Sequence, residues 1–206
     1  MNQKDFNTLL KQSLKDNFAQ EKKRFTVSND GLLFSKNDKH HGGFHLQCLG
    51  GKTALSMKLI FADEEINAFI QSLGIQYPSF TLAMVSIDIW AAKSNSDFSG
   101  IYAGIPLPVT DDGARDLIAR IIGNIRDAWM PFLLGLIHRD VSGIGFIADF
   151  MRKNPRDGFS FPLHICLFIA KQNHLSFPEF AQQIKSTPKL SRDMRADWEI
   201  ARRILS

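Results

Sequence analysis

Residues 111–137, with the sequence DDGARDLIARIIGNIRDAWMPFLLGLI, decide the fold because they predict one long helix in the core. The large apolar residues recur at steps of three and four, which places them on one broad face of a helix. They are Leu117, Ile118, Ile121, Ile122, Ile125, Trp129, Phe132, Leu133 and Leu136. Thr110 or Asp111 can cap the start of this helix.

Pro131 interrupts the helical pattern. It lacks a backbone N–H, and its ring crowds the carbonyl of Asp127, so the sequence predicts a kink or a break near 127–131. A membrane-spanning helix needs roughly 20 mostly apolar residues. The polar triplet 138–140 ends the apolar run before that length is reached, so we expect a buried core helix and no membrane span.

The composition is that of a globular chain of 206 residues, with 44% hydrophobic and 22% charged residues. The net charge of +4 is dispersed, with small basic clusters at 22–24 and 202–203. Such clusters are typical of solvated helix ends, whereas nucleic-acid binders concentrate charge in a stripe. Cys48 and Cys166 lie among apolar residues, which favours core positions. The polar start resembles no signal peptide, so we expect a cytoplasmic protein with reduced thiols.

The first part of the chain predicts a helix followed by antiparallel strands. Residues 3–22 carry apolar side chains at four-residue steps, and residues 25–36 read as a hairpin around the turn Asn29-Asp30-Gly31. Further strands are expected at 44–49 and 53–61. Asp63 should cap a short helix that ends near Gly74.

Two more strands are expected before the long helix. Residues 81–91 alternate, with one face formed by Val85, Ile87 and Ile89 and the other by Ser86, Asp88 and Trp90. Residues 101–105 suggest a short last strand. Everything after residue 110 is expected to be helical, with helices near 141–153 and 191–205. Ser160-Phe161-Pro162 and Ser176-Phe177-Pro178 both resemble helix starts, with Ser as the cap and Pro in the first turn.

This order predicts an α+β fold: an N-terminal helix, an antiparallel sheet of about five strands, a long proline-broken helix and a C-terminal helical subdomain. Residues 1–140 would form the α+β core. Residues 141–206 would form a helical extension packed on it, within one structural unit.

The densest group of chemically active side chains is KHHGGFH at 39–45, with three histidines in six residues. Paired ligands at the spacing of structural zinc sites are absent from this segment, so an exposed polar hairpin loop is expected. His138-Arg139-Asp140 has the order of a kinase catalytic-loop triplet without the accompanying kinase motifs, and is expected to be a polar stop after the long helix. Asp63-Glu64-Glu65 and Asp111-Asp112 serve helix starts.

Three other residues have side chains that could take part in catalysis. Cys166 and His164 are two positions apart, and on one helix their side chains diverge by roughly 200°. Asp88 needs a basic partner if its strand face is buried, and otherwise points to solvent beside Ser86. The sequence therefore assigns no catalytic, cofactor-binding or metal-binding residue, and no cofactor.

The first part of the chain resembles a group of small bacterial proteins of unknown function, some of which look like immunity proteins encoded beside toxins. The shared features are the leading helix from Asp5 to Phe18, the aromatic hairpin with Arg24-Phe25 and Leu33-Phe34, and the strand with Leu46-Gln47. Pro131-Phe132-Leu133 fits the later helix. The resemblance covers about residues 1–137 and transfers no functional residue.

This resemblance implies a bacterial cytoplasmic protein-binding module, most specifically an immunity protein whose partner is a cognate toxin. The positive net charge argues mildly against a basic nuclease as that toxin. One alternative is a small enzyme with a site assembled from Asp88, His41 and Cys48 on separate strands. Another is a weak nucleic-acid-binding protein, which would bind in a salt-sensitive manner.

Overall fold

The computed structural model describes residues 2–21, 25–28, 31–37, 40–48, 54–75, 84–89, 104–154, 158–184 and 194–206. These residues form an α+β fold with an N-terminal helix, an antiparallel sheet and C-terminal helices, as the sequence predicts. Within them, no helix is both long and apolar enough to cross a bilayer.

The strands of the described residues form one antiparallel sheet in the order β1-β2-β3-β4-β5-β7, and β6 pairs with the start of β4. Their bounds are β1 (Phe25–Ser28), β2 (Gly31–Asn37), β3 (His40–Cys48), β4 (Ala54–Asp63), β5 (Val85–Asp88), β6 (Ile105–Pro106) and β7 (Gly158–Phe159). β3 and β4 pair along the whole length of β3, from His40 opposite Asp63 to Cys48 opposite Leu55. This central pair forms the middle of the sheet.

The described helices lie before, between and after these strands. Their bounds are α1 (Gln3–Asn17), α2 (Glu64–Ser72), α3 (Asp111–Asn124), α4 (Met130–His138), α5 (Val141–Lys153), α6 (Pro162–Gln172), α7 (Phe177–Ile184) and α8 (Met194–Ile204). A short 3-10 turn, η1 (Ala19–Glu21), follows α1, and a π-helical turn, η2 (Ile125–Trp129), joins α3 to α4.

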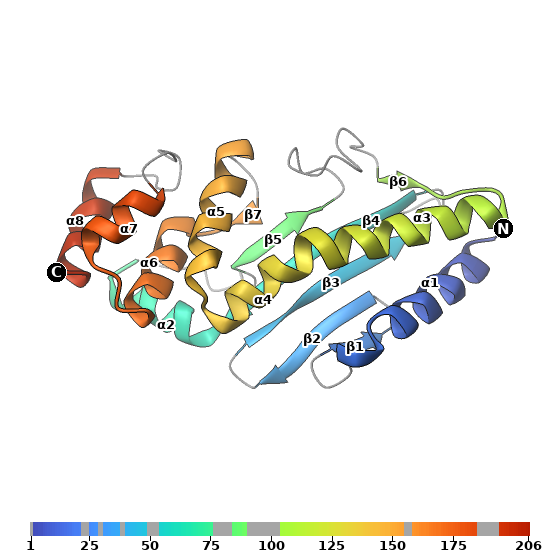
Figure 1. Cartoon of the computed structure of the whole chain (residues 1–206), viewed down its shortest axis with the longest axis horizontal. Helices are drawn as coiled ribbons and strands as arrows, with labels where there is room; N and C mark the ends of the chain where they lie inside the picture. Colours follow the sequence, from blue (N-terminus) through green and yellow to red (C-terminus); the bar gives the residue numbers. More distant parts are fainter. Residues whose placement is uncertain are drawn as a thin grey trace.

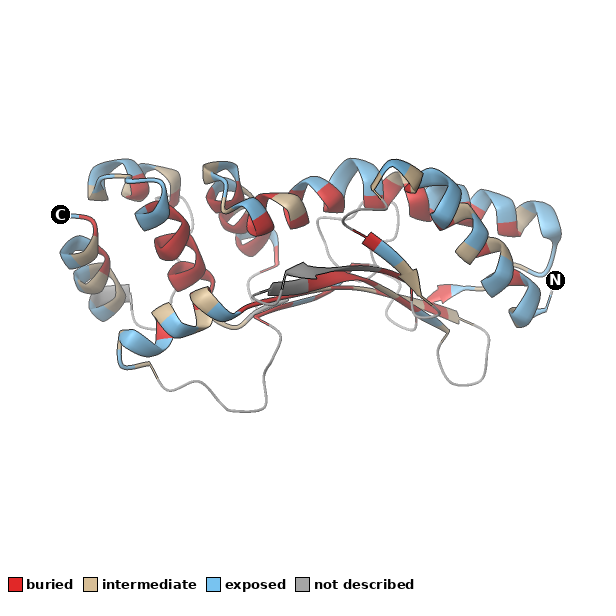
Figure 2. Ribbon diagram, turned by 90° about the horizontal axis from the view of Figure 1, so that it is seen from below, coloured by how far each residue is buried: buried red, intermediate tan, exposed pale blue. Residues whose placement is uncertain are grey.

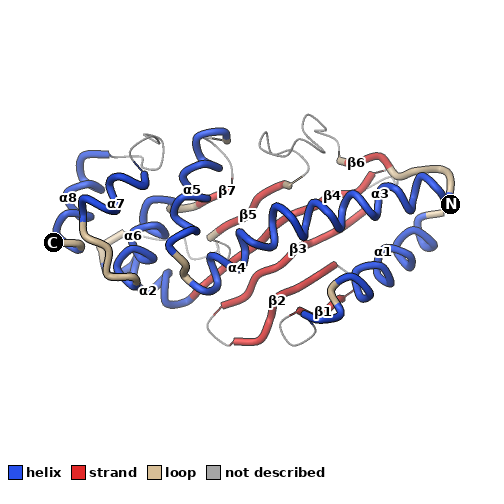
Figure 3. Tube along the Cα trace, in the orientation of Figure 1, coloured by secondary structure: helices blue, strands red, loops and turns tan. Residues whose placement is uncertain are grey.

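A layer of helices covers one face of the sheet (Figure 1). α1 and the long helix formed by α3, η2 and α4 run side by side across this face, and Figure 2 shows them on one side of the strands. The later helices gather at the end of the molecule opposite the N-terminus, as the secondary-structure colours show in Figure 3. The core therefore lies between the helix layer and one sheet face and continues among the later helices.

Alternation along β4 explains this one-sided core. Leu55, Met57, Leu59 and Phe61 are almost fully buried, whereas the intervening side chains are only half-buried. Successive strand residues point to opposite faces, so these four residues meet the helices together. On β3, Gly42 lets α4 come close, because a Cβ there would lie 2.9 Å from the Ile60 carbonyl oxygen and 3.3 Å from a Leu133 methyl group.

The first hairpin and the Asp63 cap are confirmed, and the helix predicted over 3–22 forms as α1, which ends at Asn17. Asn2 caps α1 by accepting the Asp5 N–H at 2.9 Å. The 25–36 hairpin forms, with Ser28 opposite Gly31, whose φ of +108° favours glycine. Residues 29–30 of its turn lie outside the described residues. Asp63 caps α2 by accepting the N–H groups of Glu65 and Ile66.

The long helix is interrupted near Pro131, as predicted, but the chain remains helical. The regular hydrogen bonds of α3 give way to the π-helical turn η2, in which the Met130 N–H donates to the Ile125 carbonyl. This wider turn stands before Pro131, which occupies the first turn of α4, where its missing N–H costs little. Thr110 is the cap of α3, accepting the Gly113 N–H at 3.1 Å.

Two strand predictions are wrong. Residues 40–43 are not a polar hairpin loop but the first part of β3, because the long β4 supplies backbone partners up to Asp63. The chain after residue 110 is not all helical either, since β7 pairs with β5, with Val85 opposite Phe159 and Ser86 opposite Gly158. The C-terminal part thus adds a strand to the sheet of the first part.

One cap prediction is wrong and its counterpart is confirmed. Ser160 does not cap α6; its N–H donates to the Met84 carbonyl and extends the pairing of β7, and Phe161 occupies the cap position. Pro162 does lie in the first turn of α6. At α7, Ser176 stands at the helix start as predicted, and its hydroxyl and N–H both donate to the Glu179 carboxylate.

Candidate functional site: the groove between α1 and α3

His45, Lys58 and Asp88 lie beside one another on neighbouring strands, on the sheet face away from α1 and α3. Lys58 is opposite His45 on one side and opposite Asp88 on the other. The Lys58 Nζ atom is 3.4 Å from Asp88 Oδ1, with side chains 41% and 50% exposed. Such an exposed ion pair contributes little to stability. Asp88 therefore takes the solvent-facing alternative, paired with a lysine.

The enzyme alternative requires Asp88, His41 and Cys48 to converge, and the sheet keeps them apart. Asp88 is opposite Lys58 of β4 and Cys48 is opposite Leu55. These β4 residues are three positions apart, so Asp88 and Cys48 face opposite sides of the sheet. Cys48 donates to Asn7 of α1, at an Sγ–Oδ1 distance of 3.5 Å. His41 is opposite Ala62, farther along β4. In the described part of the chain, no three His, Cys, Asp or Glu residues gather as metal ligands.

Cys166 and His164 have separate environments on α6. Cys166 is fully buried, which raises the pKa of its thiol and disfavours the reactive thiolate. His164 is 5% exposed, and its Nε2 lies 3.4 Å from Asp197 Oδ1 of α8 without the alignment of a hydrogen bond. Burial lowers the pKa of His164, and the Asp197 carboxylate offsets part of that effect. The two residues do not form a nucleophile and base.

The triplet 138–140 is a structural junction. Arg139 ends α4 in the left-handed conformation, with φ of +56°, and Asp140 caps α5 by accepting the Ser142 N–H. The Arg139 guanidinium contacts Asp63 at 3.3 Å and Glu65 at 2.6 Å. The predicted polar stop is confirmed. The carboxylates at the start of α2 also bind this arginine, which the sequence did not indicate.

The basic clusters do not form a continuous stripe in the described part of the chain. Arg202 and Arg203 are exposed near the end of α8, and Arg202 lies over the Phe177 ring at 5.3 Å. The cluster at 22–24 lies outside the described residues. On α1 and α3, basic and acidic residues are mixed.

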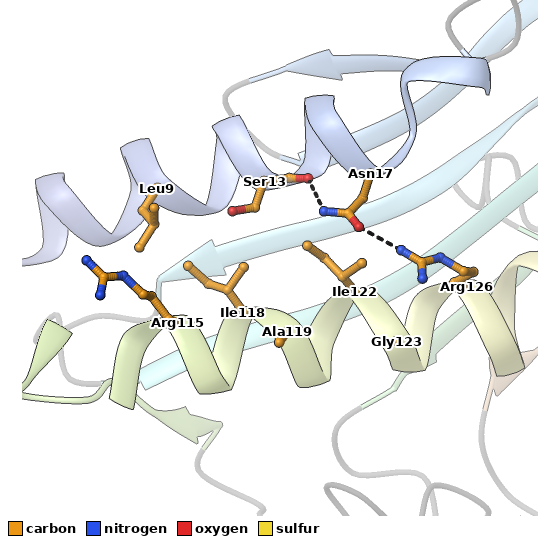
Figure 4. Close-up of a pocket in the computed structure, with 9 residues that line it drawn as sticks. All are labelled: Leu9, Ser13, Asn17, Arg115, Ile118, Ala119, Ile122, Gly123 and Arg126. Atoms are coloured by element: carbon orange, nitrogen blue, oxygen red, sulfur yellow. Dashed lines mark hydrogen bonds between the residues drawn. The ribbon is translucent and has the colours of Figure 1, made fainter. Parts of the chain in front are cut away.

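A groove of about 320 Å³ runs between α1 and α3 (Figure 4). Its wall on α1 comes from residues at four-residue steps, because these lie on one face of a helix. The groove is lined by Leu9, Ser13 and Asn17 of α1 and by Arg115, Ile118, Ala119, Ile122, Gly123 and Arg126 of α3 and η2. Its floor is therefore apolar and its ends are polar.

The charged residues that line the groove are both arginines. Arg115 lies at the Leu9 end and Arg126 at the Asn17 end (Figure 4). Arg126 donates to Asn17 Oδ1 at 2.7 Å, and Asn17 in turn donates to the Ser13 carbonyl at 2.9 Å. Arg115 is 68% exposed and pairs at 3.3 Å with Asp112, which is 93% exposed. Each guanidinium has five N–H donors, so both retain donors for an acidic group.

Gly123 lies on the groove side of α3 without a packing reason in the chain itself. Apart from the adjacent residues and the backbone of the helix itself, the nearest atom to a Cβ placed there is Asp127 Oδ2, at 4.0 Å. Glycine in a helix interior costs about 1 kcal/mol relative to alanine. Gly123 therefore weakens the helix at this point, and it adds no side chain to the groove beside the exposed Ala119.

None of the residues that line the groove was predicted as a site from the sequence. The signal was present: Arg115, Ala119, Ile122 and Arg126 recur at three- and four-residue steps beside the core face. Nothing in the sequence indicated that α1 would form the opposite wall, because that pairing joins segments about a hundred residues apart.

The resemblance to small bacterial immunity proteins stays a prediction from sequence. Comparisons of the chain with protein-family models, with curated proteins and with solved structures found no match.

Proposed function

We propose that the protein is a cytoplasmic binding protein, most specifically an immunity protein that binds and neutralises a cognate bacterial toxin. The observation that carries this proposal is the groove between α1 and α3, with an apolar floor and an arginine at each end. Complementary charges steer association and select partners. The groove therefore fits a protein surface that combines apolar side chains with carboxylates.

The positive charge of the groove favours a toxin with an acidic surface. A basic nuclease would present positive charge to Arg115 and Arg126, and the like charges would repel. An acidic docking surface on the toxin is the complementary choice. A stable interface covers about 800 Å² on each partner, so the toxin would also contact the exposed sides of α1 and α3 around the groove.

The proposal is tested by co-expressing the chain with the toxin encoded by the adjacent gene and measuring cell survival and complex formation. The wild type should protect the cells and co-purify with the toxin. The double variant Arg115→Glu/Arg126→Glu should lose both properties, because each substitution places a carboxylate opposite an acidic surface.

A matched control is Arg202→Glu/Arg203→Glu on α8, which changes the net charge equally and lies on a helix that does not line the groove. It should protect as well as the wild type. If the wild type neither binds the toxin nor protects the cells, the proposed function is wrong. Salt-sensitive binding to duplex or single-stranded nucleic acid would instead support the nucleic-acid-binding class.

A further inference from the structure

The groove has the dimensions of a helix-binding site. Arg115 and Arg126 are eleven positions apart along the long helix. At 1.5 Å per residue, this places their Cα atoms roughly 16 Å apart along the axis. Eleven residues make about three turns, so two carboxylates with this spacing also fall on one face of an α-helix. A partner helix lying along α3 could therefore place one carboxylate at each arginine.

The floor of the groove favours a helix over an extended peptide. Leu9 and Ala119 present apolar surface above the buried Ile118 and Ile122, and neighbouring α1 and α3 use their own backbone groups within the helices. An extended segment would bury N–H and C=O groups against this floor without partners, which costs free energy. A helix satisfies its backbone internally and presents only side chains.

Gly123 and Ala119 fit the same occupant. They are one turn apart, between the two arginines, and a Cβ on Gly123 would have free space around it in the chain alone. A second helix can approach α3 more closely where the side chains are this small.

We propose that the groove between α1 and α3 binds an amphipathic acidic helix of the partner protein, which lies along α3 over the groove. Its apolar side chains contact Leu9 and Ala119 above the buried Ile118 and Ile122, its carboxylates contact Arg115 and Arg126, and its backbone passes close to Gly123. This inference rests on the proposed function for the identification of the partner as a protein.

The test uses a fluorescein-labelled synthetic helical peptide of about 18 residues, long enough to form helix on binding. Leucines are placed along one face, and two glutamates eleven positions apart flank them. Fluorescence anisotropy with the full chain should show saturable binding. Binding should weaken at least about tenfold, or 1.4 kcal/mol, for Gly123→Leu and for Arg115→Gln/Arg126→Gln.

Gly145 of α5 supplies the matched control, because no atom lies within 4 Å of a Cβ placed there and it does not line the groove. Gly145→Leu should bind the peptide as the wild type does. Gly123→Ala and Gly145→Ala should both raise the Tm of the isolated protein, which shows that Gly123 is not required for folding.

Two further peptides check the chemistry of the occupant. One carries lysines in place of the glutamates, and the other carries a central proline that breaks the helix. Both should bind at least about tenfold more weakly. Equal binding of the lysine or proline peptide, unchanged binding to Gly123→Leu, or no saturable binding to the wild type would overturn the inference.

The outcome is separable from that of the proposed function. If the wild type protects cells from the toxin while Gly123→Leu also protects them fully, the immunity function stands and the helix-binding site is wrong. If the acidic peptide binds but the toxin does not, the helix-binding site stands and the immunity function is wrong. A dimer in sedimentation experiments, lost in Gly123→Leu, would identify a second copy of the chain as the occupant and overturn the inference.

Discussion

Arg139 connects three segments through one side chain. It sits between α4 and α5, its guanidinium contacts the Asp63 and Glu65 carboxylates, and it lies 5.1 Å from the centre of the Phe168 ring. The Asp63 side chain is fully buried, whereas that of Arg139 is 23% exposed. The buried carboxylate depends on this arginine and on the start of α2 for its interactions.

We expect Arg139→Ala to lower the free energy of unfolding by about 2–4 kcal/mol, because Asp63 would lose its buried partner. Arg139→Gly should be less destabilising by about 1 kcal/mol, because glycine adopts the left-handed conformation without strain. Urea denaturation measures both values. Arg115→Ala, which removes an exposed ion pair, is the control and should change stability by less than about 1 kcal/mol. Equal losses for all three variants would contradict the assigned role.

His164 predicts a pH dependence of stability. Its pKa is about 6.5 in the unfolded chain and lower in the fold, where burial disfavours the charged imidazole. The neutral form therefore stabilises the fold fully above about pH 6.5, and this contribution decreases as the pH falls through 6.5 towards the lower folded pKa.

Urea denaturation of the wild type at a series of pH values should show this loss. His164→Gln, which cannot take up the proton, should lose less stability between about pH 7.5 and 5.5. His138→Gln, at an exposed position of α4, should keep the pH dependence of the wild type. A wild-type profile in His164→Gln would show that another group controls this range.

At the scale of elements, the long helix accommodates Pro131 by widening. The π-helical turn η2 contains one more residue than a regular path would need, and Ala128 within it is exposed. The buried Trp129 follows, and it contacts Phe150 at 6.0 Å and Phe146 at 6.3 Å between ring centres. The wide turn thus accommodates Pro131 and places the Trp129 side chain against α5.

Deleting Ala128 should remove the wide turn while keeping the flanking helices in register. The proline ring would then meet the carbonyl four residues earlier, at a cost of about 3 kcal/mol. The further substitution Pro131→Ala should restore most of this stability, because alanine fits a regular helix. The two variants are compared by thermal and urea denaturation. If the double variant is no more stable than the deletion alone, the turn positions Trp129 and is not needed to accommodate Pro131.

At the scale of the whole molecule, several contacts join the first and C-terminal parts. β7 pairs with β5, Phe69 of α2 packs on Phe168 of α6 at 5.4 Å, and Phe132 stacks on Phe146 at 4.0 Å. Cutting the chain near residue 140 would expose all these surfaces. The predicted extension 141–206 is therefore integrated with the core through both the sheet and the helices.

We expect the full chain to unfold in one cooperative transition, with coincident midpoints by far-UV circular dichroism and by tryptophan fluorescence. A fragment of residues 1–140 should lack a cooperative transition and bind a hydrophobic dye, because Phe132 and Trp129 would lose their partners on α5. A fragment that unfolds cooperatively near the midpoint of the full chain would instead establish residues 1–140 as an independent domain.

The sequence predicts the elements whose pattern is local. The 111–138 helix, the first hairpin and the cap at Asp63 follow from periodicity and short-range hydrogen bonding. The start of β3 at His40 and the strand β7 were missed, because their residues are held by distant partners in β4 and β5. The groove was missed for the same reason: it needs α1 beside α3, and each wall alone resembles an ordinary exposed helix face.

The pairing of β7 with β5 also has a consequence for synthesis on the ribosome. Val85 leaves the ribosome roughly 70 residues before its partner Phe159, which at about 5–20 residues per second is a delay of several seconds. During that interval the β5 edge is unpaired, and unpaired edges promote aggregation. β5 is short and exposes Ser86 and Asp88, and short strands with charged side chains are features that blunt such edges.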